Sequence, residues 1–372
     1  MSYKVNIYNE FGPNLRSIWR IFENECDIYV FQCYDWIAYW YQTIGINNLH
    51  IKPCIIVVTD NSLPVALFPF GIRKCLGARV LEFLGGDQSD YNAPLVHPNY
   101  SSFNLCNDFW KSVLKHLPNH DFQLFNRMPA LLNQGDNPVL KIWSSFPVNE
   151  SYAASLAQSW DLFQQRISPK IRNDSRRQLR RLSELGTVEL HIATTDKEYD
   201  RLVTAMIEQK RRRYQETGAR DILSVEATRI FYSGLRGAIG DDGSVHLSAL
   251  ILNDKILATH WGMVYGDRFY FLMPTYAGGE WKKFSMGRLL QEKIIEWAIE
   301  DGFKIFDFTI GREQYKKKWC DQKMTIYSRE KLISIFGILF FIFTLLSRLL
   351  KMNPTSRKYL MKLNKNIKRF CQ

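Results

Sequence analysis

Residues 245–276 read VHLSALILNDKILATHWGMVYGDRFYFLMPTY. They contain three runs rich in β-branched and aromatic residues, separated by the short turns Asn253-Asp254 and Gly266-Asp267. Turns of these types connect neighbouring antiparallel strands. The stretch therefore predicts an antiparallel meander of three strands.

The residues after the meander predict a crossover to a fourth strand. A loop at 277–284 leads to a helix over 285–300, with apolar residues at 286, 290, 294 and 297 and a stop at Gly302. The sequence KIFDFTI at 304–310 then returns as a strand. A strand-helix-strand connection of this kind places the fourth strand parallel to the third.

Further helices and strands are predicted on the amino-terminal side of the meander. Ser168 and Pro169 are typical of a helix start, and helices are expected over 169–185, 197–217 and 227–239. Before residue 151, IIVVTD and VALFPFGI indicate a hairpin flanked by helices at 32–44 and 103–117. The chain is therefore expected to have a mixed α/β fold with two regions.

Charge is concentrated at the carboxyl end. The 372 residues carry a formal charge of +12, and residues 331–372 contain nine Lys or Arg and no Asp or Glu, which leaves the rest at +3 (12 − 9). A basic segment of this kind favours an acidic partner. The seven cysteines include no Cys-x-x-Cys pair, so they do not indicate a zinc site.

The loop before the helix at 285–300 is a candidate anion site. A helix start exposes free N–H groups and a partial positive charge, and Lys282 and Lys283 lie beside it. Ser285 can cap the helix, and Gly287 lets the backbone approach a bulky ligand. The same pattern is also typical of an ordinary capped helix with solvated lysines.

Two polar residues stand in apolar strands. His260 is at the centre of the second meander strand, and Asp307 is within the fourth strand. An imidazole can take a proton from an attacking amine, and a carboxylate can orient it or bind substrate. A structural role in the core, with Asp307 accepting backbone N–H groups, is the alternative for both.

The segment after the fourth strand carries further candidate binding residues. Glu313, Tyr315 and Lys316 follow Gly311 at the carboxyl end of this strand, where ligands tend to bind in parallel α/β arrangements. A solvated first helical turn is the alternative.

The motifs in this half of the chain resemble the CelD/BcsL family of acyltransferases, which are FemAB-like members of the GNAT superfamily. The family pattern has a Pro-x-Tyr strand end, then Ser-Pro-Gly-x-x-Leu, then Phe-Asp-x-x-x-Gly-x-Glu-x-Tyr-Lys. The matching residues are Pro274-Thr275-Tyr276, Ser285-Met286-Gly287 with Leu290, and Phe306-Asp307 through Gly311, Glu313, Tyr315 and Lys316. Met286 replaces the usual proline, and Arg312 stands where an acidic residue is common.

The resemblance extends through Ser168-Pro169-Lys170 with its arginine-rich helix and more loosely into the first domain, so that it covers about residues 5–325. It includes Phe31-Gln32 with Trp36 and Trp40, Leu84-Gly85-Gly86, Ser89-Asp90-Tyr91 and Arg127-Met128-Pro129. It implies two tandem GNAT-like domains, which we place at 1–151 and 152–330, followed by a hydrophobic and basic helical tail at 331–372.

The resemblance also implies transfer of an acyl group from a thioester, acyl-CoA such as acetyl-CoA, without a metal. His260 is expected to be the base, and Asp307 its orienting or substrate-binding partner. Tyr276, Glu313, Tyr315 and Lys316 would surround the acceptor, and Lys282, Lys283, Ser285 and Gly287 would contact the donor phosphates.

The tail begins with LISIFGILFFIFTLLS at 332–347, sixteen residues without a charge. As a helix this segment is about 24 Å long, shorter than a ~30 Å hydrocarbon core. A basic helix expected at 357–369 would favour anionic lipid. We therefore expect a cytoplasmic protein with peripheral membrane contact through 332–369; the alternative is a helix that covers an apolar groove on the second domain. The amino terminus lacks the pattern of a secretory signal.

The leading functional hypothesis is an N- or O-acyltransferase acting on a sugar or amino sugar of a surface polysaccharide or its precursor. A second is a FemAB-type transferase that uses aminoacyl-tRNA and a cell-wall precursor, with the arginine-rich helix and residues 210–213 contacting phosphates. No other nucleic acid is expected as a partner. A third is a non-catalytic scaffold in polysaccharide biosynthesis or export.

Overall fold

The computed structural model describes residues 3–100, 106–132 and 135–352. Contacts divide the chain into two compact units. Unit 1 contains the residues up to Asn149 and the stretch from Thr325 onward, and unit 2 contains Glu150–Met324. The expected boundary near 151 therefore lies close to the observed one. The expected boundary at 330/331 differs, because residues from 325 on belong to unit 1.

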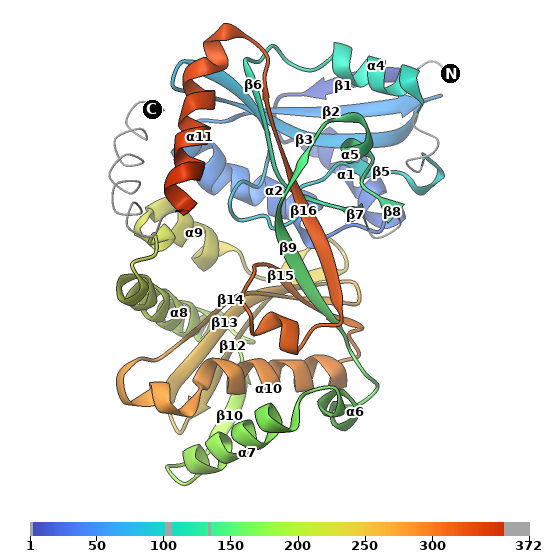
Figure 1. The fold of residues 1–372 in the computed structure, drawn as a ribbon. Coiled ribbons are helices and arrows are strands. Elements are labelled where there is room, and N and C mark those ends of the chain that lie inside the picture. Colours follow the sequence, from blue (N-terminus) through green and yellow to red (C-terminus); the bar gives the residue numbers. More distant parts are fainter. Residues whose placement is uncertain (1–2, 101–105, 133–134, 353–372) are drawn as a thin grey trace. The chain divides into compact units, whose positions relative to one another are not determined.

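Unit 1 is a mixed sheet with helices (Figure 1). Its strand order is β1-β2-β3-β4-β6-β16, with β5 added to β3. Neighbours are antiparallel except β4 and β6, which are parallel. The bounds of its main strands and helices are β1 (Tyr3–Tyr8), α1 (Pro13–Glu25), α2 (Tyr34–Trp40), α3 (Ile46–Leu49), β2 (Lys52–Asp60), β3 (Leu63–Cys75), β4 (Ala78–Phe83), β5 (Leu95–Val96), α4 (Asn107–Lys115), β6 (Phe122–Pro129), β7 (Leu131–Leu132), β8 (Gly135–Asp136), α5 (Pro138–Ile142), β16 (Gln322–Leu332) and α11 (Ile338–Met352).

Unit 2 repeats this topology. Its strand order is β10-β12-β13-β14-β15-β9, with β11 added to β12, and only the β14–β15 pair in this path is parallel. The bounds are β9 (Phe146–Ser155), α6 (Trp160–Gln165), α7 (Pro169–Ser183), β10 (Val188–Ile192), α8 (Asp196–Thr217), α9 (Glu226–Gly234), β11 (Ala238–Ile239), β12 (Gly243–Leu252), β13 (Lys255–Tyr265), β14 (Arg268–Tyr276), α10 (Met286–Glu300) and β15 (Ile305–Ile310). The predicted meander and parallel crossover are confirmed.

The two units exchange their last strands: the strand that completes each sheet comes from a different part of the chain than its neighbour in that sheet. The strand after β6 and the short β7 and β8 is β9, which pairs with β15 in unit 2. The strand after β15 is β16, whose residues from Ile326 on pair with β6 in unit 1. Residues 325–352 belong to unit 1 because β16 completes its sheet.

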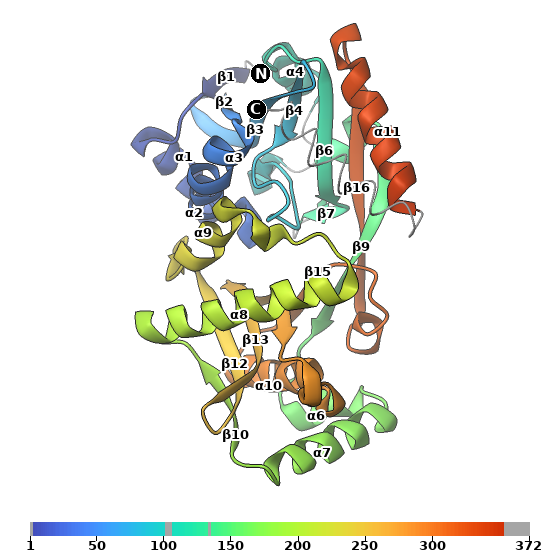
Figure 2. The same ribbon diagram turned by 90° about the vertical axis from the view of Figure 1, so that its left-hand side faces the viewer.

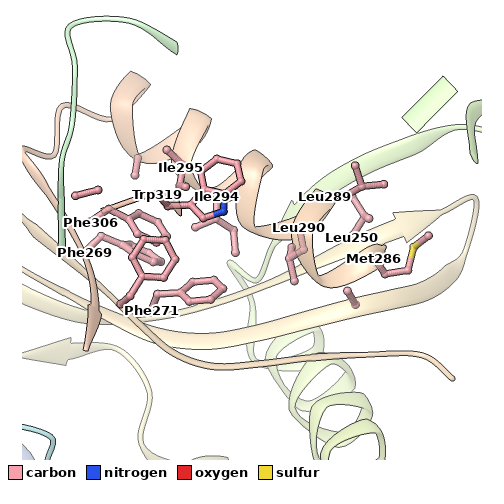
Figure 3. Packing of buried hydrophobic residues seen from close by; sticks show 14 of the residues in the cluster. Leu250, Phe269, Phe271, Met286, Leu289, Leu290, Ile294, Ile295, Phe306 and Trp319 are labelled. Carbon is pink, nitrogen blue, oxygen red and sulfur yellow. The ribbon is translucent and has the colours of Figure 1, made fainter. Parts of the chain in front are cut away.

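The core of unit 2 lies between the sheet and α10, as Figure 3 shows. Alternate strand residues such as Phe269, Phe271 and Phe306 meet Leu290 and Ile294 of the helix. The helix α8 contacts the opposite face of the sheet, where Thr259 bonds Gln209 and Trp261 bonds Tyr199 (Figure 2). Both sheet faces are therefore covered.

The residues of unit 1 that resemble the family pattern contact one another around the loop at 84–91. The indole of Trp36 donates to the Ser89 hydroxyl at 2.8 Å, and Arg127 forms an ion pair with Asp90 at 2.8 Å. At Gly85, with φ +105°, a β-carbon would lie 2.1 Å from the Ser89 oxygen. The motif residues of this unit thus stabilise the turn at 84–91.

Candidate active site

Strands β14 and β15 pair over three residues only, from Arg268–Ile305 to Tyr270–Asp307. Strand β14 then continues to Tyr276 and β15 to Ile310. Two irregularities accompany this separation: a register shift in the β13–β14 ladder between Trp261 and Met263, and another in the β15–β9 ladder after Asp307. The carboxyl-terminal half of β14 is therefore not bonded to β15 in the described structure.

His260 lies in the core beside this separation. Its side chain has no exposed surface, and its ring stacks on Phe271 with centroids 4.3 Å apart and an interplanar angle of 7°. The Leu272 N–H donates to Nε2 at 3.2 Å. Burial, with smaller effects from His246 and Lys210, lowers the pKa of His260 well below its usual range. This placement does not support the expected general base, because the neutral ring is shielded and Nε2 is already used.

Asp307 points to the opposite face of the sheet from His260. Phe306 packs with Phe269 and Phe271 on the His260 side, and successive strand residues alternate between faces. The Asp307 carboxylate instead forms an ion pair with Arg268 at 2.9 Å and accepts the Thr309 N–H at 2.7 Å. The expectation that Asp307 orients His260 is thus corrected.

Thr309 shows what Asp307 does locally. Its φ is +55°, in the left-handed region, which is unfavourable for a β-branched residue. The hydrogen bond from its N–H to Asp307 holds this conformation at the point where β15 leaves its regular register. Asp307 therefore shapes the strand end that leads to Gly311.

Glu313 and Lys316 come together after β15, as their predicted grouping requires. Lys316 is buried, and its Nζ donates to the Ile310 carbonyl at 2.8 Å and lies 3.3 Å from Glu313. Gly311 adjoins both, since a β-carbon there would lie 2.0 Å from Glu313 Oε2. Tyr315 is 37% exposed and its ring lies 6.3 Å from that of Phe308. Burial raises the pKa of Tyr315.

Helix α8 adds a residue that was not singled out for this site from the sequence. The Nζ of Lys210 lies 3.4 Å from the Pro274 carbonyl oxygen of β14 and 5.7 Å from the Tyr214 ring centroid. Burial lowers the pKa of Lys210 to about 8, and the charge of Glu313 opposes the shift. The buried stripe of α8 includes Met206 and Gln209, so its helical spacing could have indicated Lys210.

Two further cations of α8, Arg212 and Arg213, also contact β14. Arg213 lies over the Tyr276 ring at 5.6 Å, and Arg212 donates a hydrogen bond to the Tyr276 carbonyl. Tyr276 thus lies near this cluster, at the end of β14. Its ring is also in contact distance of Gly287, where a β-carbon would lie 3.3 Å away.

Replacing Lys210 with methionine should flatten the dependence of stability on pH. Between pH 8 and its ordinary pKa of 10.5, Lys210 binds more protons in the unfolded chain than in the folded protein. The free energy of unfolding of the wild type should therefore rise with pH across this window, by on the order of 3 kcal/mol. The Lys210→Met variant should not show this rise. Urea unfolding of both proteins at several pH values measures the difference.

Lys197→Met, on the exposed face of the same helix, is the matched control and should retain the wild-type slope. Equal slopes for wild type and Lys210→Met would contradict the placement of this amine.

The residues expected to contact donor phosphates have partners within the protein. Lys282 pairs with Glu216 at 3.1 Å, and Lys283 lies 5.1 Å over the Phe284 ring. Ser285 has φ +57° and makes no side-chain capping bond to the described helix. The predicted helix start is correct to within one residue, but the serine cap is wrong because the backbone turns left-handed at Ser285.

A pocket of about 790 Å³ is lined by residues from the start of α7 and from the first turn of α10. Five cationic side chains line it: Arg166, Lys170, Arg177, Arg288 and Lys318. The rest of the lining is the Asp174 carboxylate and the residues Ser168, Ile171 and Asn173. Arg288 is in the first turn of α10, and most of the remaining residues are at the start of α7. Hydrogen bonds from Arg288 and Arg177 lower the pKa of Asp174. The lining makes the pocket a candidate anion site; the arginine-rich helix was expected to contact phosphates only in the tRNA hypothesis, and Arg288 and Lys318 were not singled out.

Comparisons with known proteins agree with this topology. Residues 169–317 match the family model described as "Acetyltransferase (GNAT) domain". No curated protein sequence matches the chain. Among solved structures, FemX has a TM-score of 0.57 at 12% identity, with 87% of this chain and 97% of FemX covered.

Two further solved structures share the fold. The C-terminal domain of a putative lysylphosphatidylglycerol synthetase from Agrobacterium fabrum has a TM-score of 0.52 at 12% identity, covering 89% of this chain and 97% of that one. L-PGS from Bacillus licheniformis has a TM-score of 0.50 at 11% identity, covering 96% and 97%. The GNAT acetyltransferase model thus matches residues 169–317, within unit 2, and this match supports a GNAT-type acyltransferase.

Proposed function

We propose that the protein transfers an acyl group from acyl-CoA to an amine or hydroxyl of a sugar in a surface polysaccharide or its precursor. The GNAT domain supports the thioester donor. The acceptor class is based on the resemblance to the CelD/BcsL family carried by Pro274 to Tyr276, Ser285 to Leu290 and Phe306 to Lys316.

The cationic pocket beside α10 is the observation that carries this proposal. Coenzyme A bears a diphosphate and a further phosphate, and guanidinium groups bind phosphate oxygens through paired, charge-assisted hydrogen bonds. Arg177 and Arg288 line this pocket together with Lys318, which follows β15. A donor bound there by its phosphates lies beside the start of α10, whose free N–H groups also favour anions.

The acyl end of the donor would then meet the separated strands β14 and β15. In the transfer, the acceptor nitrogen or oxygen forms a bond to the thioester carbonyl carbon, the carbon–sulfur bond breaks, and the acceptor loses a proton. Lys210, with its pKa near 8, is better placed than His260 to take this proton. Its amine lies beside Pro274, near the end of β14, and close enough to Glu313 to be affected by its charge. Lys316 and Glu313 would position the acceptor.

Aminoacyl-tRNA is the alternative donor. The same cations would attract its phosphates, and the FemX likeness shows a shared fold. The scaffold hypothesis is set aside, since the GNAT domain identifies an enzyme.

The donor is tested by calorimetry with Arg177→Gln. We expect wild-type protein to bind acetyl-CoA, and Arg177→Gln to weaken binding about tenfold, which is about 1.4 kcal/mol, because one phosphate contact is lost. Arg180→Gln removes the same charge from an exposed position of the same helix outside the pocket lining and should bind as wild type does.

Salt-dependent binding of tRNA without uptake of any coenzyme A thioester would establish the alternative donor. Equal binding by the two variants would refute the pocket assignment. The acceptor is tested in the same series by mass spectrometry of surface glycans. A deletion strain should lose an acyl mass, and wild-type protein should restore more of it than Arg177→Gln.

A further inference from the structure

Unit 1 exposes several large apolar side chains on α11 and on the segment before it. We call this set the α11 surface; its members are Ile333, Ile335, Phe336, Ile338, Leu339, Ile342, Leu345 and Leu346. Exposure reaches 74% at Ile335, 67% at Phe336 and 65% at Leu339. Spacings of three, four and seven residues place most of them on one side of the helix. Apolar surface gathered in this way marks an interaction site.

The opposite side of α11 is anchored to unit 1. Phe340 is 2% exposed and packs edge-on against Phe122 of β6 with centroids 5.1 Å apart. Cys75, Ala78 and Val80 complete this cluster. Because this face is buried within unit 1, the helix has a fixed orientation and the α11 surface points outward.

The entry to α11 is also fixed. Ser334 donates a hydrogen bond to the Asp121 carboxylate at 2.6 Å, and Arg79 donates to the same group at 3.0 Å. The Ile333 N–H bonds the Asp121 carbonyl at 2.9 Å. The hydrogen bonds from Arg79 and Ser334 lower the pKa of the Asp121 carboxyl. The α11 surface is thus held rigidly at the edge of a folded unit.

The described part of α11 is shorter than the hydrocarbon core of a bilayer. Its 15 residues extend about 22 Å at ~1.5 Å per residue, against a ~30 Å hydrocarbon core. Within the described part of the chain, no helix meets the length and hydropathy of a membrane span. A helix with one anchored face and one apolar outer face suits contact with the interfacial layer of a membrane.

The charge of the adjoining sequence identifies the partner. Residues 331–372 contain nine Lys or Arg and no acidic residue; the expected basic helix at 357–369 lies outside the described residues. Each cation near an anionic membrane surface contributes roughly 1 kcal/mol to binding. A second copy of the chain would bring the same positive charges together, so self-association through this surface is disfavoured.

We propose that the α11 surface binds the surface of a bilayer containing anionic lipid, with its apolar side chains entering the interface. This inference goes beyond the proposed transfer reaction and is independent of its donor and acceptor. It would place unit 1 at the membrane.

The test is flotation of the full-length protein with two kinds of vesicle, phosphatidylcholine alone and phosphatidylcholine mixed with phosphatidylglycerol. We expect strong binding to the mixed vesicles that weakens at high salt. The double variant Phe336→Gln/Leu339→Gln should bind the mixed vesicles at least about tenfold more weakly, because two apolar side chains no longer enter the lipid interface. Leu63→Gln, also 65% exposed but in the β2–β3 hairpin, should bind as wild type does.

Thermal unfolding shows whether each variant is folded, and the single variant Ile335→Gln repeats the test if the double variant is not. Two results would overturn the proposal. One is equal binding by wild type and a folded α11 variant. The other is a wild-type dimer in light scattering that the α11 variants dissociate, with no binding to either kind of vesicle.

Discussion

Replacing Gly262 with valine should prevent unit 2 from forming a stable sheet. A β-carbon at Gly262 would lie 2.3 Å from the Tyr270 carbonyl oxygen and 2.4 Å from Cε1 of His260. The backbone at Tyr270 cannot easily withdraw, because Tyr270 is also paired with Asp307 on its other side. Overpacking against a fixed backbone is expected to lower the free energy of unfolding by more than about 3 kcal/mol.

The measurement is urea unfolding of Gly262→Val, followed by tryptophan fluorescence. Gly12→Val is the matched control, since Gly12 has an extended backbone with φ −146° and open space within 4 Å in the described structure. It should unfold near the wild-type midpoint. Similar midpoints for the two valine variants would show that the β13–β14 irregularity can accommodate a side chain.

Gly262 also shows where prediction from the sequence stopped. The turn residues Asn253-Asp254 and Gly266-Asp267 predicted the meander because two-residue turns fix strand pairing locally. The shift in pairing between Trp261 and Met263 depends on contacts between β13 and β14 and has no comparable local signal. His260 stacks on Phe271 beside this shift, at a position where alternation alone left a core role or a site role open.

The helix bounds were largely predictable, and the candidate site was predictable in part. Capping residues and apolar spacing gave α7, α8 and α10 to within a few residues. Glu313 and Lys316 form an ion pair after one strand end, and their role at the acceptor stays a prediction. Lys210 and Arg177 come from other helices, and their place in the site depends on packing that one sequence does not specify.

The pairing of β9 with β15 and of β16 with β6 could not be predicted from local sequence patterns. The segments of β9 and β16 each resemble an ordinary edge strand, and nothing in their residues indicates that β16 pairs with β6 rather than within unit 2. The hydrophobic run after β16 was therefore predicted as a separate tail. Its first part instead extends from the last strand of unit 1 and packs against Phe122.

The second large effect is expected at Arg268. Its guanidinium is 14% exposed and pairs at 2.9 Å with the Asp307 carboxylate, which is 2% exposed. Removing one member of a buried ion pair leaves a charge that neither water nor its former partner stabilises, at a typical cost of about 3–5 kcal/mol. Arg268→Met should therefore be destabilised by about this amount in urea unfolding. Lys111→Met breaks an exposed pair with Asp108 and should change stability by less than about 1 kcal/mol.

The double variant Arg268→Met/Asp307→Asn separates a structural role from a catalytic one. If Asp307 acts through Arg268 and Thr309, the neutral amide should recover much of the stability lost in Arg268→Met, because no unpaired charge remains and the Thr309 N–H still has an acceptor. A catalytic Asp307 predicts a different result. Asp307→Asn alone would then lose acyl transfer while unfolding at the wild-type urea concentration. The position of Asp307 on the face opposite His260 favours the structural outcome, in which activity and stability fall together.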